Sequence, residues 1–278
     1  MKLSIITINY NNKEGLKKTL DSIFHQSFQD FEYIIIDGSS TDGGKEIIEE
    51  NSEKINYWVS EPDKGVYHAM NKGIKAAKGE YLLFLNSGDG LYNEKTLENL
   101  IPLLHTEDII TGNLNFISDK NNFIGISQVQ ISFIHMYKDT IWHPCSFIKK
   151  EAFKKTEMYD ENLKICADWK WFLLAIYKYH LTYKKIDLTV SKFFLDGISS
   201  SEENTSLIVK ERQDALSNIF GFKLHDFIKF EQIIDSDQQL INSQQHLKKL
   251  EYKIISLKKS RILKLLYRLR VFKAYKYL

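Results

Sequence analysis

Short apolar runs alternate with helical patterns along about the first 110 residues of the chain. Residues 3–8, 31–36 and 81–85 are continuous apolar runs rich in β-branched or aromatic side chains, which is typical of strands covered on both faces. Between them, apolar residues recur at helical spacing, as in 16–24 and 65–77. This alternation predicts an α/β fold in which helices flank an open, mostly parallel sheet.

Acidic residues follow the predicted strands near the points where those strands end. Asp37 closes the run 31–36, Asp89 follows the run 81–85, and Asp63 lies in a loop after a short predicted strand at 55–59. Ligands of open parallel sheets bind at the carboxyl ends of the strands. The topology therefore gathers these distant acids at one edge of the sheet, which is the predicted ligand site.

Size and composition limit the classes of protein to consider. The 278 residues are enough for one large domain with or without a small appendage, and a net charge of +2 does not indicate a nucleic-acid partner. The two cysteines, Cys145 and Cys166, form neither a metal pattern nor a disulfide framework, so a reducing cytosol is expected. No apolar run approaches the roughly 20 residues of a membrane-spanning helix.

The later part of the chain is organised differently. We expect 1–112 and 113–200 to be two halves of one domain, 201–237 to be a helical extension, and the Gln-rich 238–245 to be a linker within a separate segment, 238–278. After Glu251 there is no acid, but there are nine Lys or Arg residues. Apolar helices flanked by cations are typical of segments that lie on anionic membranes. The alternative is a helix that packs on the body or on a second subunit, so a homodimer stays open.

Four motifs occur in register along the first half of the chain. They are SIITINYN at 4–11, IDGSSTDG at 36–43, EPDKGVYHAMNKG at 61–73 and FLNSGD at 84–89. In order and spacing they resemble family 2 glycosyltransferases, in particular the colanic-acid-type branch that builds bacterial surface polysaccharides. The resemblance covers roughly residues 1–200. It implies a GT-A (Rossmann-like) fold, a nucleotide-diphosphate sugar donor, a divalent cation and inversion at the anomeric carbon.

The resemblance also implies where the cation lies. Asp89 matches the last acid of the family's acidic turn, and Asn86 and Gly88 occupy positions where many members carry acids. Asn86 still offers a neutral oxygen, and His143 matches a histidine expected to contact the metal or the diphosphate. Magnesium or manganese held in this way would stabilise the leaving diphosphate as a Lewis acid. For Asp89 alone, the alternative is a plain turn residue.

Other residues are implied to bind the donor. Asp37 matches the acid that accepts a hydrogen bond from a uracil-type base, and Thr7 and Asn9 end the first strand beside it. Asp63 is expected to contact the nucleotide or ribose, and Lys64 to offset phosphate charge. The alternatives are structural: an Asx turn for Asp37, backbone capping for Thr7 and Asn9, and a solvated side chain for Lys64.

Asp168 matches the family's catalytic acid late in the domain and is implied to be the general base. The structural alternative is an N-cap of the helix that starts near it. A loop at 196–200 is expected to close over the donor or acceptor.

The overall prediction is an inverting glycosyltransferase that acts on a glycan or lipid-linked acceptor. It is expected in the cytoplasm, peripheral on the inner face of the membrane. A nucleotidyltransferase is the first alternative, although residues 9–15 lack the Gly-rich, basic loop of that class. A non-catalytic scaffold with the same fold is the second, because acids are few at 86–89.

Overall fold

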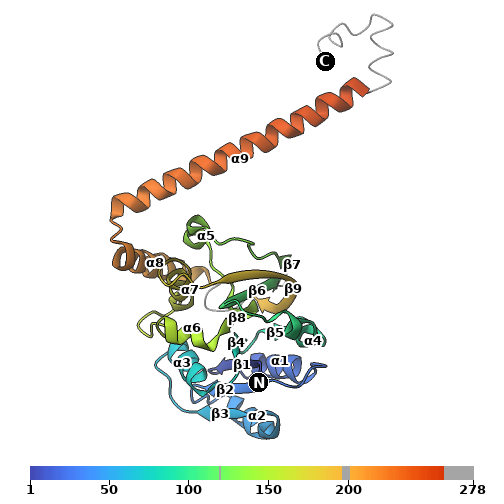
Figure 1. Cartoon of the computed structure of the whole chain (residues 1–278), viewed down its shortest axis with the longest axis vertical. Coiled ribbons are helices and arrows are strands. Elements are labelled where there is room, and N and C mark those ends of the chain that lie inside the picture. Colours follow the sequence, from blue (N-terminus) through green and yellow to red (C-terminus); the bar gives the residue numbers. More distant parts are fainter. Residues whose placement is uncertain (119, 196–200, 260–278) are drawn as a thin grey trace, which may run out of the picture. The chain divides into compact units, whose positions relative to one another are not determined.

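The structure is a computed structural model that describes residues 1–118, 120–195 and 201–259 (Figure 1). It comprises two units, Met1–Ala215 and a second that begins at Leu216. The strands are β1 (Leu3–Asn9), β2 (Glu32–Asp37), β3 (Tyr57–Ser60), β4 (Tyr81–Phe84), β5 (Gly90–Leu91), β6 (Ile109–Ile117), β7 (Asn122–Gly125), β8 (Ser146–Lys149) and β9 (Tyr183–Phe194). The α-helices are α1 (Lys13–Phe24), α2 (Gly44–Glu50), α3 (Val66–Ala76), α4 (Thr96–Leu100), α5 (Phe133–Lys138), α6 (Lys150–Lys155), α7 (Ala167–Tyr177), α8 (Thr205–Phe220) and α9 (Leu224–Lys259).

The strands form one sheet in the order β3-β2-β1-β4-β8-β6-β9-β5, with β7 paired to β6. The first four strands are parallel, as the alternating pattern predicts. The second half adds antiparallel pairs of β8 with β4 and β6, of β7 with β6, and of β5 with β9. The parallel half therefore aligns the carboxyl ends of β1, β2 and β4, where the predicted donor residues lie.

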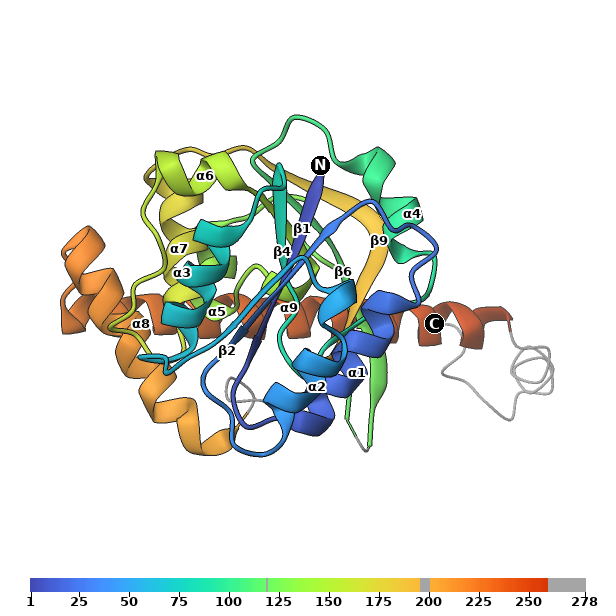
Figure 2. The ribbon, with the colours of Figure 1, turned by 90° about the horizontal axis from the view of Figure 1, so that it is seen from below.

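Helices cover both faces of the parallel half (Figure 2). Leu3 and Ile5 of β1 belong to a core cluster that also contains Leu16 of α1 and Leu97 of α4. The next residue along the strand, Ile6, faces the other side, where it packs against Gly73 of α3. Alternate strand residues thus enter two different cores, which is why the strand sequences are apolar at every position.

Two predictions of element bounds differ from the structure: the linker at 238–245 and the third strand at 55–59. The predicted linker 238–245 lies inside α9, because the segment has neither proline nor glycine and glutamine is a good helix former. The helical extension is instead interrupted at Gly221, whose φ of 70° favours glycine and ends α8. The third strand, expected at 55–59, is Tyr57–Ser60.

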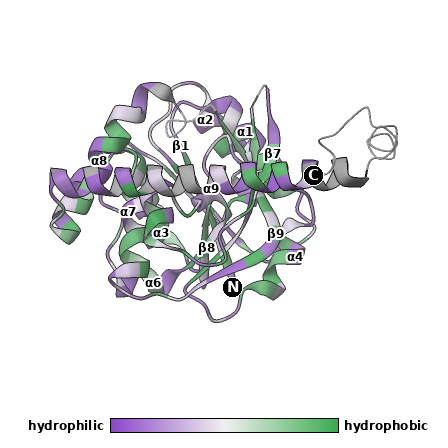
Figure 3. Ribbon diagram, turned by 90° about the horizontal axis from the view of Figure 1, so that it is seen from above, coloured by the Kyte–Doolittle hydropathy of each residue, from purple (hydrophilic) through white to green (hydrophobic). Residues whose placement is uncertain are grey.

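No helix among the described residues is long and apolar enough to cross a membrane. Along α9, hydrophilic and hydrophobic residues are mixed (Figure 3). The predicted closing loop at 196–200 and most of the predicted basic amphipathic helix, from residue 260 onward, lie outside the described residues.

Candidate active site

Asp37, at the end of β2, lies beside Asn9, at the end of β1. The Nδ2 atom of Asn9 and the hydroxyl of Ser40 donate to Oδ1 of Asp37 at 2.8 and 2.6 Å. The hydroxyl of Ser60 and the backbone N–H of Ser40 donate to Oδ2 at 2.6 and 2.9 Å. A carboxylate has about four acceptor positions, so all of them are used within the protein. A ligand could bond to Asp37 only by displacing one of these donors.

These hydrogen bonds also set the charge state of Asp37. Burial alone would raise its pKa, but the bonds from Ser40, Ser60 and Asn9 outweigh burial and hold the pKa below its usual range. Asp37 is fully buried. It therefore acts as an ionised anchor that shapes the loop after β2.

Thr7 does not line the ligand edge, contrary to the prediction. It is fully buried, and its hydroxyl donates to the carbonyl of Leu85 at 2.8 Å and accepts from the Tyr33 hydroxyl at 3.1 Å. The side chain of Thr7 alternates with those of its neighbours and so enters the core. Its role is to fix the chain just before the 86–89 turn.

Asp63 lies beside Gly38, the residue that follows Asp37, and we call this region the Gly38 corner. A Cβ atom added to Gly38 would lie 3.0 Å from the ring of Tyr10 and 3.3 Å from Oδ2 of Asp63, so both side chains border Gly38. Tyr10 is 69% exposed, and sequence reasoning missed it although it directly follows β1. The corner thus offers an aromatic face beside a carboxylate, which suits a planar base and a ribose.

The carboxylate of Asp63 is paired within the protein. Its Oδ1 accepts from Nζ of Lys72 at 2.5 Å and lies 3.0 Å from Nδ1 of His68. Nζ of Lys72 also contacts Glu61 at 2.8 Å. The predicted donor residue Lys64 is exposed, and its backbone N–H reaches Nδ1 of His68 at 3.4 Å. This ion-pair group fixes the loop at the corner's outer rim.

Thr19 of α1 holds the turn that carries Asp89. Its hydroxyl donates to the carbonyl of Asp89 at 2.6 Å and accepts the N–H of Gly88 at 3.0 Å. Gly88 has a φ of 110°, a conformation that favours glycine. This explains why no acid stands at position 88. Thr19 is fully buried, and sequence reasoning missed it because threonine at a helical core position has no distinctive pattern.

A chain of contacts joins this turn to Asp168. Nδ2 of Asn86 lies 3.4 Å from Nε2 of His143, and Nδ1 of His143 lies 3.1 Å from Oδ2 of Asp168. The hydroxyl of Tyr67, on α3, donates to Oδ1 of Asp168 at 2.9 Å. The Oδ1 atom of Asn86 is buried and has no hydrogen-bond partner within the part of the chain that the structure describes. His143 and Tyr67, from segments distant in sequence, therefore meet at Asp168, and Asn86 is linked to Asp168 through His143.

Asp168 is a largely buried, ionised carboxylate. Burial would raise its pKa, but the hydrogen bond and charge of His143 and the bond from Tyr67 bring the pKa below its usual value. Its side chain is still 14% exposed. The alternative role as N-cap was wrong: Cys166 is the N-cap of α7, and Asp168 is the second helical residue, so its side chain points to the site.

Glu211 of α8 supports the segment before Asp168. Its carboxylate accepts the backbone N–H groups of Lys164, Ile165 and Cys166 at 2.7, 3.1 and 3.0 Å. These N–H groups belong to the N-cap of α7, Cys166, and to the two residues before it. Sequence reasoning missed this contact because it joins residues more than 40 positions apart.

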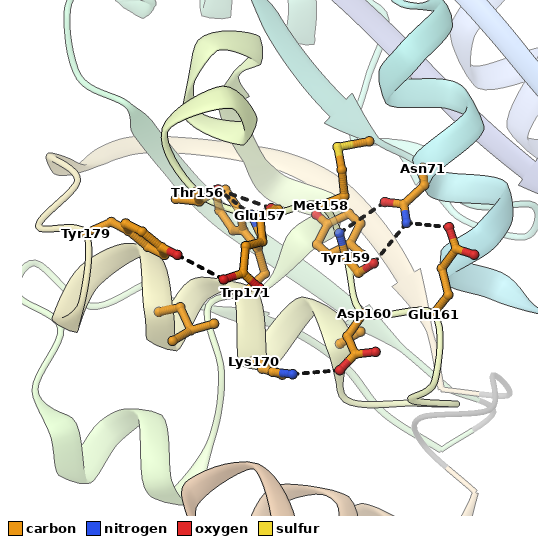
Figure 4. Close-up of a pocket in the computed structure, with 12 residues that line it drawn as sticks. Asn71, Thr156, Glu157, Met158, Tyr159, Asp160, Glu161, Lys170, Trp171 and Tyr179 are labelled. Atoms are coloured by element: carbon orange, nitrogen blue, oxygen red, sulfur yellow. Dashed lines mark hydrogen bonds and ion pairs between the residues drawn. The ribbon is translucent and has the colours of Figure 1, made fainter. Parts of the chain in front are cut away.

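A cavity of the first unit lies away from these residues. It measures about 380 Å³, and its lining comes mainly from α3, α7 and the segment 156–161 that connects α6 to α7 (Figure 4). Polar groups of its lining contact one another, as in the ion pair of Lys170 with Asp160 and the hydrogen bond from Asn71 to Glu161. None of the predicted site residues lines it. The candidate active site is therefore the strand edge, not this cavity.

Comparison with known proteins identifies the family of the chain. A model of the family described as glycosyl transferase family 2 matches residues 4–162. The chain belongs to glycosyltransferase family 2. The matched range contains the predicted ligand residues from Thr7 to His143, and it ends six residues before Asp168.

Relatives of this family 2 glycosyltransferase occur in several bacteria. An uncharacterized glycosyltransferase of Mycobacterium tuberculosis is 31% identical over 180 residues, which are 62% of this chain and 68% of the relative. A PGL/p-HBAD biosynthesis glycosyltransferase of Mycobacterium bovis is 30% identical over 172 residues, 60% of this chain and 66% of the relative. A teichoic acid poly(glycerol phosphate) polymerase of Staphylococcus epidermidis is 25% identical over 251 residues, 82% of this chain but 34% of that protein.

Solved structures confirm the GT-A-like fold. TarS residues 1–349 from S. aureus, in complex with UDP-GlcNAc, superpose with a TM-score of 0.60 at 22% identity, covering 73% of this chain and 61% of that one. The mannosyltransferase PcManGT from Pyrobaculum calidifontis, in complex with GDP-Man and Mn²⁺, gives 0.55 at 14% identity, covering 99% and 82%. The fold prediction, an α/β sheet flanked by helices, is thus confirmed.

Proposed function

We propose that this glycosyltransferase moves a sugar from a nucleotide-diphosphate donor to an acceptor hydroxyl with inversion at the anomeric carbon. The observation that carries the proposal is the series of contacts Asn86–His143–Asp168, which joins the turn of Asp89 to a largely buried, ionised carboxylate. Such a reaction needs a group that stabilises the leaving diphosphate and a base near the acceptor. The turn at 86–89, at one end of this series of contacts, would supply the first group, and Asp168, at the other end, would supply the base.

The nucleotide end of the donor is assigned to the corner around Gly38. The exposed ring of Tyr10 offers a stacking face for the base, and Asp63, which borders Gly38 beside it, would accept a hydrogen bond from the ribose. Asp37 and Asn9 act here by holding the loop in shape. Lys64, exposed beside the corner, would offset phosphate charge.

A divalent cation, Mn²⁺ or Mg²⁺, fits the turn at 86–89. No group of three or more His, Cys, Asp or Glu side chains suited to a metal occurs among the described residues. A cation that relies on diphosphate oxygens needs only one or two protein carboxylates, however. Asp89 would provide one, and the unpartnered Oδ1 of Asn86 and Nε2 of His143 would complete the set. When bound, the cation would neutralise charge on the departing diphosphate.

Asp168 would take the proton of the acceptor hydroxyl. Both of its oxygens receive a hydrogen bond, from Tyr67 and from His143, and these bonds hold the carboxylate ionised and oriented. An in-line attack requires the base on the side of the anomeric carbon opposite the diphosphate. We therefore assign the acceptor to the space between Asp168 and the donor sugar.

We further propose a glycan or lipid-linked acceptor in bacterial surface polysaccharide synthesis. The names of the relatives support this class, because they include a PGL/p-HBAD biosynthesis enzyme and a teichoic acid polymerase. The basic residues after Glu251 would then hold the enzyme at the inner face of the membrane, where such an acceptor lies.

A donor screen tests the proposal. The full chain is mixed with UDP-, GDP- and dTDP-sugars with and without Mn²⁺, and its melting temperature is recorded. One donor should raise the melting temperature, and the rise should be larger with Mn²⁺. The variant Asp89→Asn should lose the Mn²⁺-dependent part. If no donor shifts the wild-type melting temperature, the chain is a non-catalytic scaffold and the proposal fails.

A further inference from the structure

The hydroxyl of Tyr159 is a buried polar group that has no hydrogen-bond partner among the described residues. The residue as a whole is 3% exposed. Other buried tyrosines have bonded hydroxyls: that of Tyr33 donates to Thr7 at 3.1 Å, and that of Tyr81 lies 2.9 and 2.8 Å from two backbone carbonyls. A buried hydroxyl without a partner destabilises a fold, and phenylalanine would avoid this cost. The hydroxyl of Tyr159 therefore needs an explanation other than stability.

The side chain of Tyr159 is fixed by its surroundings. Its ring contacts four aromatic rings, at centroid distances of 5.5 to 6.1 Å: Tyr67, Phe84, Phe153 and Trp171. Nδ2 of Asn71 donates to the backbone carbonyl of Tyr159 at 2.9 Å, and the backbone N–H of Tyr159 donates to Oδ1 of Asn71 at 3.1 Å (Figure 4). A rotation that carried the hydroxyl to solvent would break this packing, so the hydroxyl stays inside the protein.

The surroundings of Tyr159 place it next to the predicted base. Of the rings that it contacts, Tyr67 donates to Oδ1 of Asp168 at 2.9 Å, and Trp171 lies about one helical turn after Asp168 on α7. Burial raises the pKa of Tyr159 well above its usual value, and the charge of Asp168 raises this pKa further. The phenol therefore keeps its proton at neutral pH, where it can donate a hydrogen bond but cannot act as a base.

The hydrogen bonds of Asp168 leave room for a further donor. The hydroxyl of Tyr67 contacts the carbonyl of Ile165 as well as Oδ1 of Asp168, and its single hydrogen can be given fully to only one of them. The side chain of Asp168 is also 14% exposed, and substrates bound there would displace the water that reaches it. Substrate binding would thus remove hydrogen bonds from an ionised carboxylate, beside which Tyr159 holds an unused donor.

We propose that the hydroxyl of Tyr159 is a reserve hydrogen-bond donor, which bonds to Asp168 when donor sugar and acceptor are bound. Tyr159 is then a positioning residue, because it acts through Asp168 and does not touch the substrates. The proton of the acceptor hydroxyl moves to Asp168, and Tyr159 keeps its own proton. Catalytic hydrogen bonds often tighten only in the substrate complex. The proposal rests on the proposed function, in which Asp168 is the base.

The variant Tyr159→Phe of the full chain tests the proposal, because stability and catalysis should change in opposite directions. Without substrates, its melting temperature should rise by about 2–4 °C, since an unbonded buried hydroxyl is removed. Its kcat should fall by about tenfold or more, the effect of losing a hydrogen bond to a charged group. Its KM for the donor should stay constant, because the nucleotide is assigned to the Gly38 corner.

The matched control is Tyr81→Phe. Tyr81 is 0% exposed, and its hydroxyl lies within bonding distance of the carbonyls of His105 and Glu107. Loss of this bonded hydroxyl should lower the melting temperature and leave kcat unchanged. Full kcat in Tyr159→Phe would overturn the proposal. So would a lower melting temperature of Tyr159→Phe, because the hydroxyl would then be bonded already in the free enzyme, for example to a buried water.

A double-mutant cycle shows whether the effect passes through the base. In the Asp168→Asn background, Tyr159→Phe should change kcat little. In the Tyr67→Phe background, where the other phenol no longer donates to Asp168, Tyr159→Phe should lower kcat more than it does in the wild type. Equal losses in all three backgrounds would contradict the proposal. Absence of transfer by the wild type with every donor would refute the proposed function itself, whereas an active wild type matched by Tyr159→Phe would refute only the role of Tyr159.

Discussion

Nδ1 of His143 lies 3.1 Å from Oδ2 of Asp168, although 25 positions separate the two residues in the chain. Because the ionised carboxylate can only accept, the proton of this contact lies on Nδ1 of His143, and Nε2 of the same ring faces Asn86. One hydrogen bond thus orients the predicted base and turns Nε2 of His143 toward the 86–89 turn.

Replacing Asp168 with asparagine should remove the base. Transfer should fall by about 10²- to 10⁴-fold, the usual contribution of a positioned general base. Donor binding should change little, because Asp168 contacts His143 and Tyr67 rather than the Gly38 corner. Initial rates and donor titration by calorimetry measure the two effects. An Asp168→Asn protein with full transfer activity would show that another group takes the proton.

Thr19 should control the geometry of the 86–89 turn, where we propose that the cation binds. Thr19→Val keeps the shape of the side chain but leaves the N–H of Gly88 and the carbonyl of Asp89 without their partner. Each lost bond to a buried group costs about 1–3 kcal/mol, so the melting temperature should fall and more Mn²⁺ should be needed for half-maximal activity. Thr19→Ser retains the hydroxyl and is the control. If both variants need the same Mn²⁺ concentration as the wild type, the hydroxyl does not position the turn.

Asn86→Asp tests whether position 86 faces the cation. A second carboxylate beside Asp89 should bind Mn²⁺ more tightly, with a half-saturating concentration roughly tenfold lower, equivalent to about 1.4 kcal/mol. Asn86→Ala removes the oxygen and should shift the Mn²⁺ requirement in the opposite direction. Metal titration of activity reads out both. A lower affinity for Mn²⁺ in Asn86→Asp than in the wild type would show that residue 86 is not a ligand of the cation.

Most of the parallel half of the fold was predictable from local pattern. The strands β1, β2 and β4 appear where continuous apolar runs predicted them, because a strand buried on both faces leaves a signal in every residue. The linker prediction at 238–245 failed because glutamine is polar but also a good helix former, so polarity alone does not separate a linker from an exposed helix.

The candidate site was predictable only in part. Asp37, Asp89 and Asp168 stand at strand or helix ends that the pattern and the resemblance identify. Thr7 was misread because a strand-end hydroxyl looks the same whether it faces a ligand or, as here, the core. Thr19 and Glu211 act through backbone groups distant in sequence, and such contacts leave no periodic or compositional trace.

The anchor role of Asp37 predicts a pH dependence of stability. Its pKa in the folded protein lies below the value of about 3.9 expected in the unfolded chain, so the ionised form stabilises the fold. This stabilisation is fully present above the unfolded pKa and is lost as the pH falls through the folded pKa. Asp37→Asn should therefore melt at a lower temperature than the wild type at pH 7. This gap, the difference between the melting temperatures of the wild type and of Asp37→Asn, should stay constant down to about pH 5 and narrow below about pH 4.

Melting curves from pH 7 to pH 3 measure this gap. Asp42→Asn, in the same loop but exposed, is the control and should show a smaller gap at neutral pH. A gap for Asp37→Asn that widens on acidification would contradict the sign of the pKa shift.

Glu211 should act on catalysis through Asp168. Its carboxylate takes three backbone N–H groups just before α7, so Glu211→Gln loses the charge and leaves at least one of these groups poorly paired. The loop before Asp168 should then loosen, and kcat should fall while the KM for the donor stays constant. Glu203→Gln, at an exposed position of the same region, is the matched control.

The decisive measurement is a double-mutant cycle. In the Asp168→Asn background, Glu211→Gln should have little further effect on kcat, because its contribution passes through the missing base. Additive losses in the cycle would instead mean that Glu211 stabilises the fold without positioning Asp168.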